Sequence, residues 1–274
     1  MIKDKQNEND KLNSINIQML NSIIDDEDEK FFQLVSQITD DEIDFNKQFS
    51  ITNYKLPKLL SDEPSYSSLC VFFKSEKCFH SLLSLFPEGL KSSIFNKKDK
   101  KGRQPIHFAC FIGNIDILRL YYQEEYDFNV KDFKGKTPSH YAAMSETSDV
   151  IKYLFSKGID ILKQIDNSYM TPIDYSCSYG NFETFKFLWE KVKNDKYCYG
   201  YKSDLLLSAA KSGCSEIIDY LLTNKIYKSN YDYMIYAIKN GYIECVKSMV
   251  NICNARINYQ RRKEVPLIVA SEKG

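Results

Sequence analysis

The sequence has few of the residues that build fibrous, low-complexity or metal-binding segments. Its 274 residues include only 10 Gly, 7 Pro and 3 His, which excludes collagen-like and linker-like chains. No apolar run approaches the roughly 18 residues that a membrane-spanning helix requires. The first eight residues also lack the apolar core of a secretion signal. We therefore expect a soluble globular protein without a membrane partner.

The cysteines do not follow the spacing of a metal site or a disulfide framework. The chain has 8 Cys, and no two of them form a Cys-x-x-Cys pair. Zinc sites usually draw their ligands from such closely spaced pairs, so we predict no metal ion and no cofactor. A chain of this length does not need disulfides for stability. Reduced thiols indicate a cytoplasmic protein, with the nucleus as the alternative.

Charge is balanced over the whole chain but not along it. Lys and Arg number 37, as do Asp and Glu, whereas a nucleic-acid-binding domain is usually strongly basic. Residues 1–64 carry 7 basic and 14 acidic side chains, and the remainder carries 30 and 23. The acidic runs at 25–29 and 40–42 are typical of a solvated surface. We therefore predict no nucleic-acid partner.

Small residues recur at a nearly fixed interval, which is the mark of a repeat protein. The intervals are 33, 34, 33, 28 and 33 residues. The positions in this column are Ala109, Ala142, Ser176, Ala209, Ala237 and Ala270. Four residues after each of them stands a second column, which is Gly at five of its six positions: Gly113, Glu146, Gly180, Gly213, Gly241 and Gly274.

Each repeat reads as a turn followed by two helices. Thr137 and Thr171 precede prolines and can cap a first helix, whose first turn accepts proline without losing a hydrogen bond. The Gly column supplies the left-handed residue that ends this helix. Apolar residues at helical spacing then follow, for example Ile217, Ile218 and Leu221.

This unit resembles the ankyrin repeat. Residues 135–143 read Gly-Lys-Thr-Pro-Ser-His-Tyr-Ala-Ala, which is similar to the family motif G-x-T-P-L-H-x-A-A with Ser139 in place of Leu. The resemblance implies an all-α fold, an ankyrin-repeat α-solenoid of stacked helix-turn-helix units with short hairpin-like fingers. A composition rich in Lys, Asn, Ile, Tyr and Phe resembles the ankyrin families expanded in AT-rich single-celled eukaryotes.

The pattern divides the chain into a divergent N-terminal part and an array of repeats. We expect disorder over 1–14, a divergent helical cap over 15–64 and a divergent ankyrin-like repeat over 65–98, with Lys74 at the Gly position. The repeats that follow lie near 99–131, 132–165, 166–199, 200–229 and 230–261, with an incomplete one at 262–274. The short interval between Ala209 and Ala237 predicts a plain loop there.

The last repeat stops after its first helix. Residues 266–270 form that helix, and Gly274 ends the sequence at the turn that would lead into a second one. Terminal repeats normally have a polar outer face, but Leu267, Ile268 and Val269 are apolar. We therefore expect either that the natural chain continues beyond this half-repeat or that the uncapped half-repeat permits self-association.

No group of residues predicts catalysis. His107 and Cys110 lie one helical turn apart, but the same register holds Ala143 and Cys177 in the next repeats, which indicates packing. Residues 134–137 resemble the end of a phosphate-binding loop, but Val130 stands where its first Gly must be. We predict no catalytic, cofactor or metal residue, and hence no enzyme.

The ankyrin resemblance implies macromolecular recognition. We expect a non-enzymatic scaffold that binds a protein partner on its concave face, made of fingers and inner helices. One alternative is a regulatory or targeting module of a larger multidomain protein, and a remote one is an enzyme with a cryptic site. Because two successive fingers are basic, we expect an acidic partner segment. The candidate contact residues are Lys98, Lys100, Lys101, Arg103, Phe111, Ile112, Lys131, Phe133, Lys134, Lys136, Met144, Met170 and Tyr179.

Overall fold

The structure of the protein is a computed structural model that describes residues 2–36, 56–85, 91–193, 204–226, 231–253 and 266–273. The chain divides into two compact units, unit 1 (Met1–Tyr141) and unit 2 (Ala142–Gly274). Helices make up most of the described residues, and none of these residues belongs to a strand. The predicted all-α fold is thereby confirmed.

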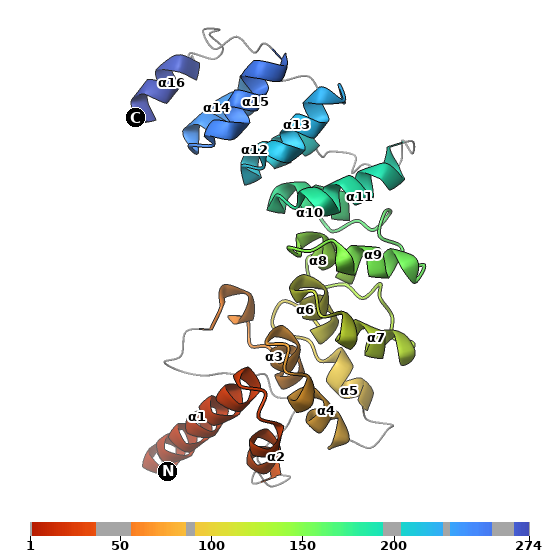
Figure 1. Ribbon diagram of the computed structural model, residues 1–274. Helices are drawn as coiled ribbons and strands as arrows, with labels where there is room; N and C mark the ends of the chain where they lie inside the picture. Colours follow the sequence, from red (N-terminus) through yellow and green to blue (C-terminus); the bar gives the residue numbers. More distant parts are fainter. Residues whose placement is uncertain are drawn as a thin grey trace. The chain divides into compact units, whose positions relative to one another are not determined.

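Unit 1 is built from helices that pair in chain order. They are α1 (Ile2–Ile24), α2 (Asp28–Ser36), the short 3₁₀ helix η1 (Lys58–Leu60), α3 (Tyr66–Phe72), α4 (Glu76–Ser84), α5 (Lys91–Asn96), α6 (Pro105–Ile112) and α7 (Ile115–Gln123). Helices α1 and α2, α3 and α4, and α6 and α7 form pairs, and α3 lies between α1 and α6 (Figure 1). Each first helix therefore packs on the first helix of the next pair.

Unit 2 follows the same rule. Helix α8 (Pro138–Met144) contains the boundary between the units. The remaining helices are α9 (Asp149–Ser156), α10 (Pro172–Tyr179), α11 (Phe182–Val192), α12 (Leu205–Ser212), α13 (Ser215–Thr223), α14 (Tyr231–Lys239), α15 (Ile243–Cys253) and α16 (Pro266–Lys273). Helix α12 packs on α10 and on α14, and α13 packs on α11 and on α15 (Figure 1).

The turn between paired helices depends on one left-handed residue. Gly113 has φ 82°, which lets the backbone N–H groups of Gly113 and Asn114 both donate to the carbonyl of Ala109 at 3.0 Å. Lys74 takes the same conformation with φ 58°, and Ser75 N then reaches Cys70 O at 2.8 Å. The prediction that Lys74 occupies the Gly position is confirmed.

The same turn joins the first two helices. Asp26 has φ 51°, and Glu27 N donates to the carbonyl of Ser22 at 2.8 Å, so the buried Ser22 occupies the position of the small-residue column. Ser75 Oγ donates to Ile23 O, much as Asn181 Nδ2 donates to Ala143 O in unit 2. Helices α1 and α2 are therefore a first copy of the repeating unit.

Two expectations differ from the structure or lie outside it. Residues 2–14, which we expected to be disordered, belong to helix α1. These residues extend a helix whose C-terminal half is packed, and a helix propagates more easily than it nucleates. The loop expected after Asn224 includes residues 227–230, which lie outside the described residues.

The C-terminal helix has both a buried and an exposed side. Helix α16 packs on α14, with Val269 buried and Ile268 54% exposed. Gly274 lies outside the described residues. Self-association through this half-repeat stays a prediction. No helix in the described part of the chain is both long and apolar enough to span a bilayer.

Candidate binding surface

The turns before helices α6, α8 and α10 share one geometry, built around an aspartate. One carboxylate oxygen of Asp99 accepts hydrogen bonds from the backbone of Lys101 and Arg103, at 2.9 and 2.8 Å. Asp132 and Asp166 do the same for the residues two and four positions after them. We call residues 99–103 finger 1, residues 132–136 finger 2 and residues 166–170, in unit 2, finger 3.

A buried side chain fixes the start of the helix behind each finger. The backbone N–H of Gln104 donates to His107 Nδ1 at 2.9 Å, and Thr137 N donates to His140 Nδ1 at 3.0 Å. In finger 3 an aspartate replaces the histidine, because Thr171 N donates to Asp174 Oδ2 at 2.8 Å. All three acceptors are fully buried.

This environment argues against chemistry at His107 and Cys110. Burial lowers the pKa of His107 to about 4, although the Asp132 carboxylate opposes that shift. Burial also raises the pKa of the Cys110 thiol well above its usual range. A neutral imidazole and a protonated thiol do not form a reactive ion pair. His107 therefore serves the helix start, as the repeat pattern predicts.

Finger 2 leans on finger 1 within unit 1. Phe133 N donates to Lys101 O at 2.9 Å, and the Phe133 ring covers Gly102 so closely that a Cβ there would lie 2.5 Å from it. Gly102 also has φ 77°, which favours glycine. Even so, Phe133 remains 65% exposed. One side of the Phe133 ring therefore packs on Gly102, and the rest of the ring is exposed to solvent.

Residues 60–64 have the geometry of a finger without its sequence. Lys100 N donates to Asp62 O at 3.0 Å, in the same register as Phe133 N to Lys101 O. Glu63 has φ 54° where finger 1 has Gly102, and Ser65 then caps helix α3 by accepting from Ser68 N at 3.1 Å. We call residues 60–64 the acidic finger. The divergent repeat expected from residue 65 therefore has its finger just before that boundary.

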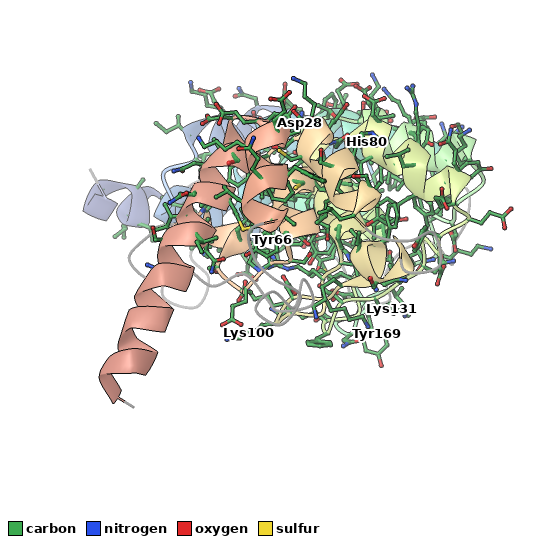
Figure 2. All side chains as sticks on the ribbon, turned by 90° about the horizontal axis from the view of Figure 1, so that it is seen from below. Asp28, Tyr66, His80, Lys100, Lys131 and Tyr169 are labelled. Atoms are coloured by element: carbon green, nitrogen blue, oxygen red, sulfur yellow. The ribbon has the colours of Figure 1, made fainter. Side chains whose placement is uncertain are left out.

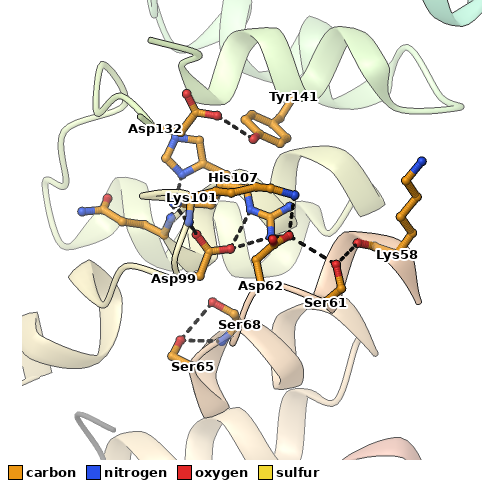
Figure 3. A network of polar contacts seen from close by, with 12 residues as sticks. Lys58, Ser61, Asp62, Ser65, Ser68, Asp99, Lys101, His107, Asp132 and Tyr141 are labelled. Carbon is orange, nitrogen blue, oxygen red and sulfur yellow. Dashed lines mark hydrogen bonds and ion pairs between the residues drawn. The ribbon is translucent and has the colours of Figure 1, made fainter. Parts of the chain in front are cut away.

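The acidic finger neutralises finger 1. Asp62 Oδ2 lies 2.5 Å from Lys101 Nζ and 3.2 Å from a guanidinium nitrogen of Arg103, and Glu63 pairs with Lys100. Figure 3 shows the Asp62 side chain beside Asp99 and at the end of the Lys101 side chain. Arg103 also pairs with Asp99 at 2.5 Å and is only 3% exposed. Three cations of finger 1 thus already have carboxylate partners.

Comparison with protein families gives the identity of the repeat. The family described as ankyrin repeats (3 copies) matches residues 68–165 and 106–200. Residues 68–200 are therefore ankyrin repeats. No curated protein matches it. Ankyrin repeats generally mediate protein–protein interaction, and the family is typically non-enzymatic.

The ankyrin fingers project away from the second helices of their pairs. Figure 2 shows Lys100 and Lys131 on one edge of unit 1 and His80, of helix α4, on the other. In the described residues, no group of three or more His, Cys, Asp or Glu side chains is placed to hold a metal ion. The finger edge therefore offers charge and aromatic surface.

The predicted contact residues fall into three groups. Lys98, Lys100, Lys101, Lys131, Phe133, Lys134 and Tyr179 are exposed; Phe111, Ile112, Lys136 and Met170 are half-buried; Arg103 and Met144 are buried. The expected exposure of the last two is therefore corrected. Arg103 turns inward to Asp99 and lies over the Phe108 ring at 4.8 Å, and Met144 is only 5% exposed on helix α8.

One exposed aromatic residue was missed by the sequence analysis. Tyr169 in finger 3 has φ 61° and is 55% exposed. It stands where fingers 1 and 2 have Gly102 and Gly135. The signal in the sequence is its place three residues after the finger aspartate, where the other two fingers have glycine. A tyrosine in that left-handed position costs stability, which marks the position as unusual.

Proposed function

We propose that the protein is a non-enzymatic binding scaffold whose unit 1 takes up an acidic, extended partner segment at finger 2. The observation that carries this proposal is the difference in charge between neighbouring fingers. Lys131, directly before finger 2, and Lys134, within it, are exposed, and no ion pair joins either of them to an acid within the described part of the chain. The lysines of finger 1, by contrast, are already paired with Asp62 and Glu63.

An exposed aromatic anchor supports the same finger. Phe133 lies between Lys131 and Lys134 in sequence and is held in place by its contact with Gly102. Interfaces draw most of their affinity from a few aromatic and cationic side chains in fixed positions. A ring that is fixed before binding loses little conformational entropy when it is covered. We therefore expect a partner with an apolar side chain among its acidic residues.

Unit 2 contributes a neutral aromatic patch of its own. Tyr175 OH donates to Asp166 Oδ2 at 2.7 Å, so this face of helix α10 turns toward finger 3. Tyr179, one helical turn further on, shares that face and is 52% exposed. Together with Tyr169, it offers apolar contacts without charge. We propose this patch as a second contact area.

A model peptide tests the proposal directly. We expect a short fluorescein-labelled peptide, in which Asp and Glu flank one Phe, to bind at low salt and to dissociate as salt rises. Combining Lys131→Glu, Lys134→Glu and Phe133→Ala should weaken binding by roughly tenfold or more, with the charge changes slowing association and the loss of the ring speeding dissociation. Fluorescence anisotropy and stopped-flow mixing measure the two quantities.

The control keeps the change in charge but moves it away from the fingers. Lys77→Glu, Lys152→Glu and Tyr122→Ala change three exposed side chains of the same kinds elsewhere on the surface. We expect this variant to bind nearly as well as the unmodified protein. Equal losses in both variants would show that only net charge matters, and no binding at low salt would reject the acidic partner.

A further inference from the structure

We propose that Asp62 and Glu63 act as an internal competitor, which occupies the lysines of finger 1 and keeps an acidic partner away from them. The inference takes its partner class from the proposed function. It adds a regulatory role, because the acidic finger determines which of the two basic fingers is accessible to the partner. The acidic finger and finger 1 both belong to unit 1.

The backbone places the two acids on finger 1. Leu60 is fully buried at one end of the acidic finger, and Ser65 caps helix α3 at the other. Between these anchors, Asp62 O accepts from Lys100 N in the register that successive fingers share. The carboxylates of Asp62 and Glu63 are therefore held beside the lysines by main-chain geometry.

The charges of the two fingers cancel. Finger 1 contributes Lys100, Lys101 and Arg103, and these face the carboxylates of Asp99, Asp62 and Glu63. An acidic segment that approached this place would meet carboxylates of its own sign. At finger 2 the only carboxylate is that of Asp132, which is engaged by backbone N–H groups and by Tyr141 OH at 2.8 Å.

The contact is nevertheless able to open. Lys100 and Lys101 are 59% and 48% exposed, and Glu63 and Asp62 are 29% and 21% exposed. Ion pairs at such exposed places are weak and screened by salt. Arg103 and Asp99, both nearly fully buried, keep the fold of finger 1 when the outer pairs separate. Competition at the outer lysines can therefore change without unfolding the finger.

The test removes the two charges and keeps the side-chain shapes. In the double variant Asp62→Asn with Glu63→Gln, the same acidic peptide should bind roughly threefold or more tightly at low salt, with a steeper salt dependence. Adding Lys100→Gln and Lys101→Gln should abolish the gain. The control is Asp116→Asn with Glu124→Gln, which changes net charge equally at exposed positions on and just after helix α7.

The possible results separate this inference from the proposed function. If the double variant binds no more tightly than the control, the inference is overturned, whether or not Lys131 and Lys134 carry binding. If binding ignores Lys131 and Lys134 but the gain appears and needs Lys100 and Lys101, the inference stands and the proposed site at finger 2 fails. Should Asp62→Asn lower the melting temperature, Glu63→Gln alone frees Lys100, and a smaller gain is expected.

Discussion

Lys74 ends helix α3 in a conformation that costs a non-glycine residue free energy. Its φ of 58° places it in the left-handed region, and its side chain is exposed. Lys74→Gly should therefore raise the free energy of unfolding by about 1 kcal/mol, because glycine adopts this conformation without a Cβ clash. Urea titration followed by circular dichroism measures the change.

A second lysine nearby is the matched control. Lys77 is exposed in the first turn of helix α4, where glycine lowers stability by up to about 1 kcal/mol. The two substitutions should thus have opposite signs although they remove the same side chain. Destabilisation by both would show that the Lys74 side chain contributes more than its backbone conformation costs.

His107 makes stability depend on pH. Its folded pKa is about 4, against an ordinary value of 6.5, because of burial. Between these two pH values the unfolded chain binds a proton that the folded chain does not, so stability is lost as pH falls from about 6.5 toward 4. The loss amounts to about 3 kcal/mol.

Substitution isolates this contribution. In His107→Gln the amide oxygen can still accept from Gln104 N, but the group does not titrate. Urea unfolding at a series of pH values between neutral and mildly acidic should show a shallower loss of stability in this variant. His80→Gln, at an exposed position, is the matched control for removal of a histidine. An unchanged slope in His107→Gln would mean that other groups cause the acid sensitivity.

Predictions for single residues were correct where the role of the residue follows from a pattern that recurs in several repeats. The roles of His107 and Lys74 follow from their place in a pattern that the sequence states several times. Arg103 was misplaced because it turns inward to Asp99 and also meets Asp62, which lies 41 residues earlier in a segment that carries no motif. The burial of a charged side chain is hard to predict from sequence when part of its environment comes from a distant segment without a motif.

At the scale of elements, backbone pairing can replace local sequence. Fingers 1 to 3 could be predicted because each begins with an aspartate that closes its own loop. The acidic finger has Leu60 in place of that aspartate, and its shape depends on the hydrogen bond from Lys100. Only the packing of finger 1 against it makes it recognisable.

The contact between fingers 1 and 2 predicts the effect of a single methyl group. Gly102→Ala introduces a Cβ at φ 77° and within 2.5 Å of the Phe133 ring. We expect a loss of about 1 kcal/mol from the conformation and a further loss as the ring moves. Fluorine NMR of fluorophenylalanine at position 133 should report the displaced ring.

Gly158→Ala separates the two causes. Gly158 has φ 74°, but nothing lies within 4 Å of a Cβ built there. It should therefore show the conformational cost alone. Equal destabilisation by the two substitutions would mean that Phe133 yields without cost and does not tie finger 2 to finger 1.

At the scale of the whole molecule, the described helix pairs within each unit pack mainly on the pairs next to them in the chain. Stability in such an array is close to a sum of terms for single repeats and their interfaces. A core defect should therefore weaken its own pair and the adjacent ones most. Leu221 of α13 and Leu69 of α3 are both fully buried, one in each unit.

Truncating either leucine tests this locality. Leu221→Ala should cost about 2–5 kcal/mol from lost burial and the cavity it leaves. Hydrogen exchange followed by mass spectrometry under native conditions should then accelerate in α12, α13 and α15 while α3, α4 and α6 stay close to their original rates. Leu69→Ala should give the reverse pattern, because α3 contacts α4 and α6. Uniform acceleration along the chain in both variants would instead show that the protein opens as one cooperative block. Its stability would then not be a sum of terms for single repeats and their interfaces.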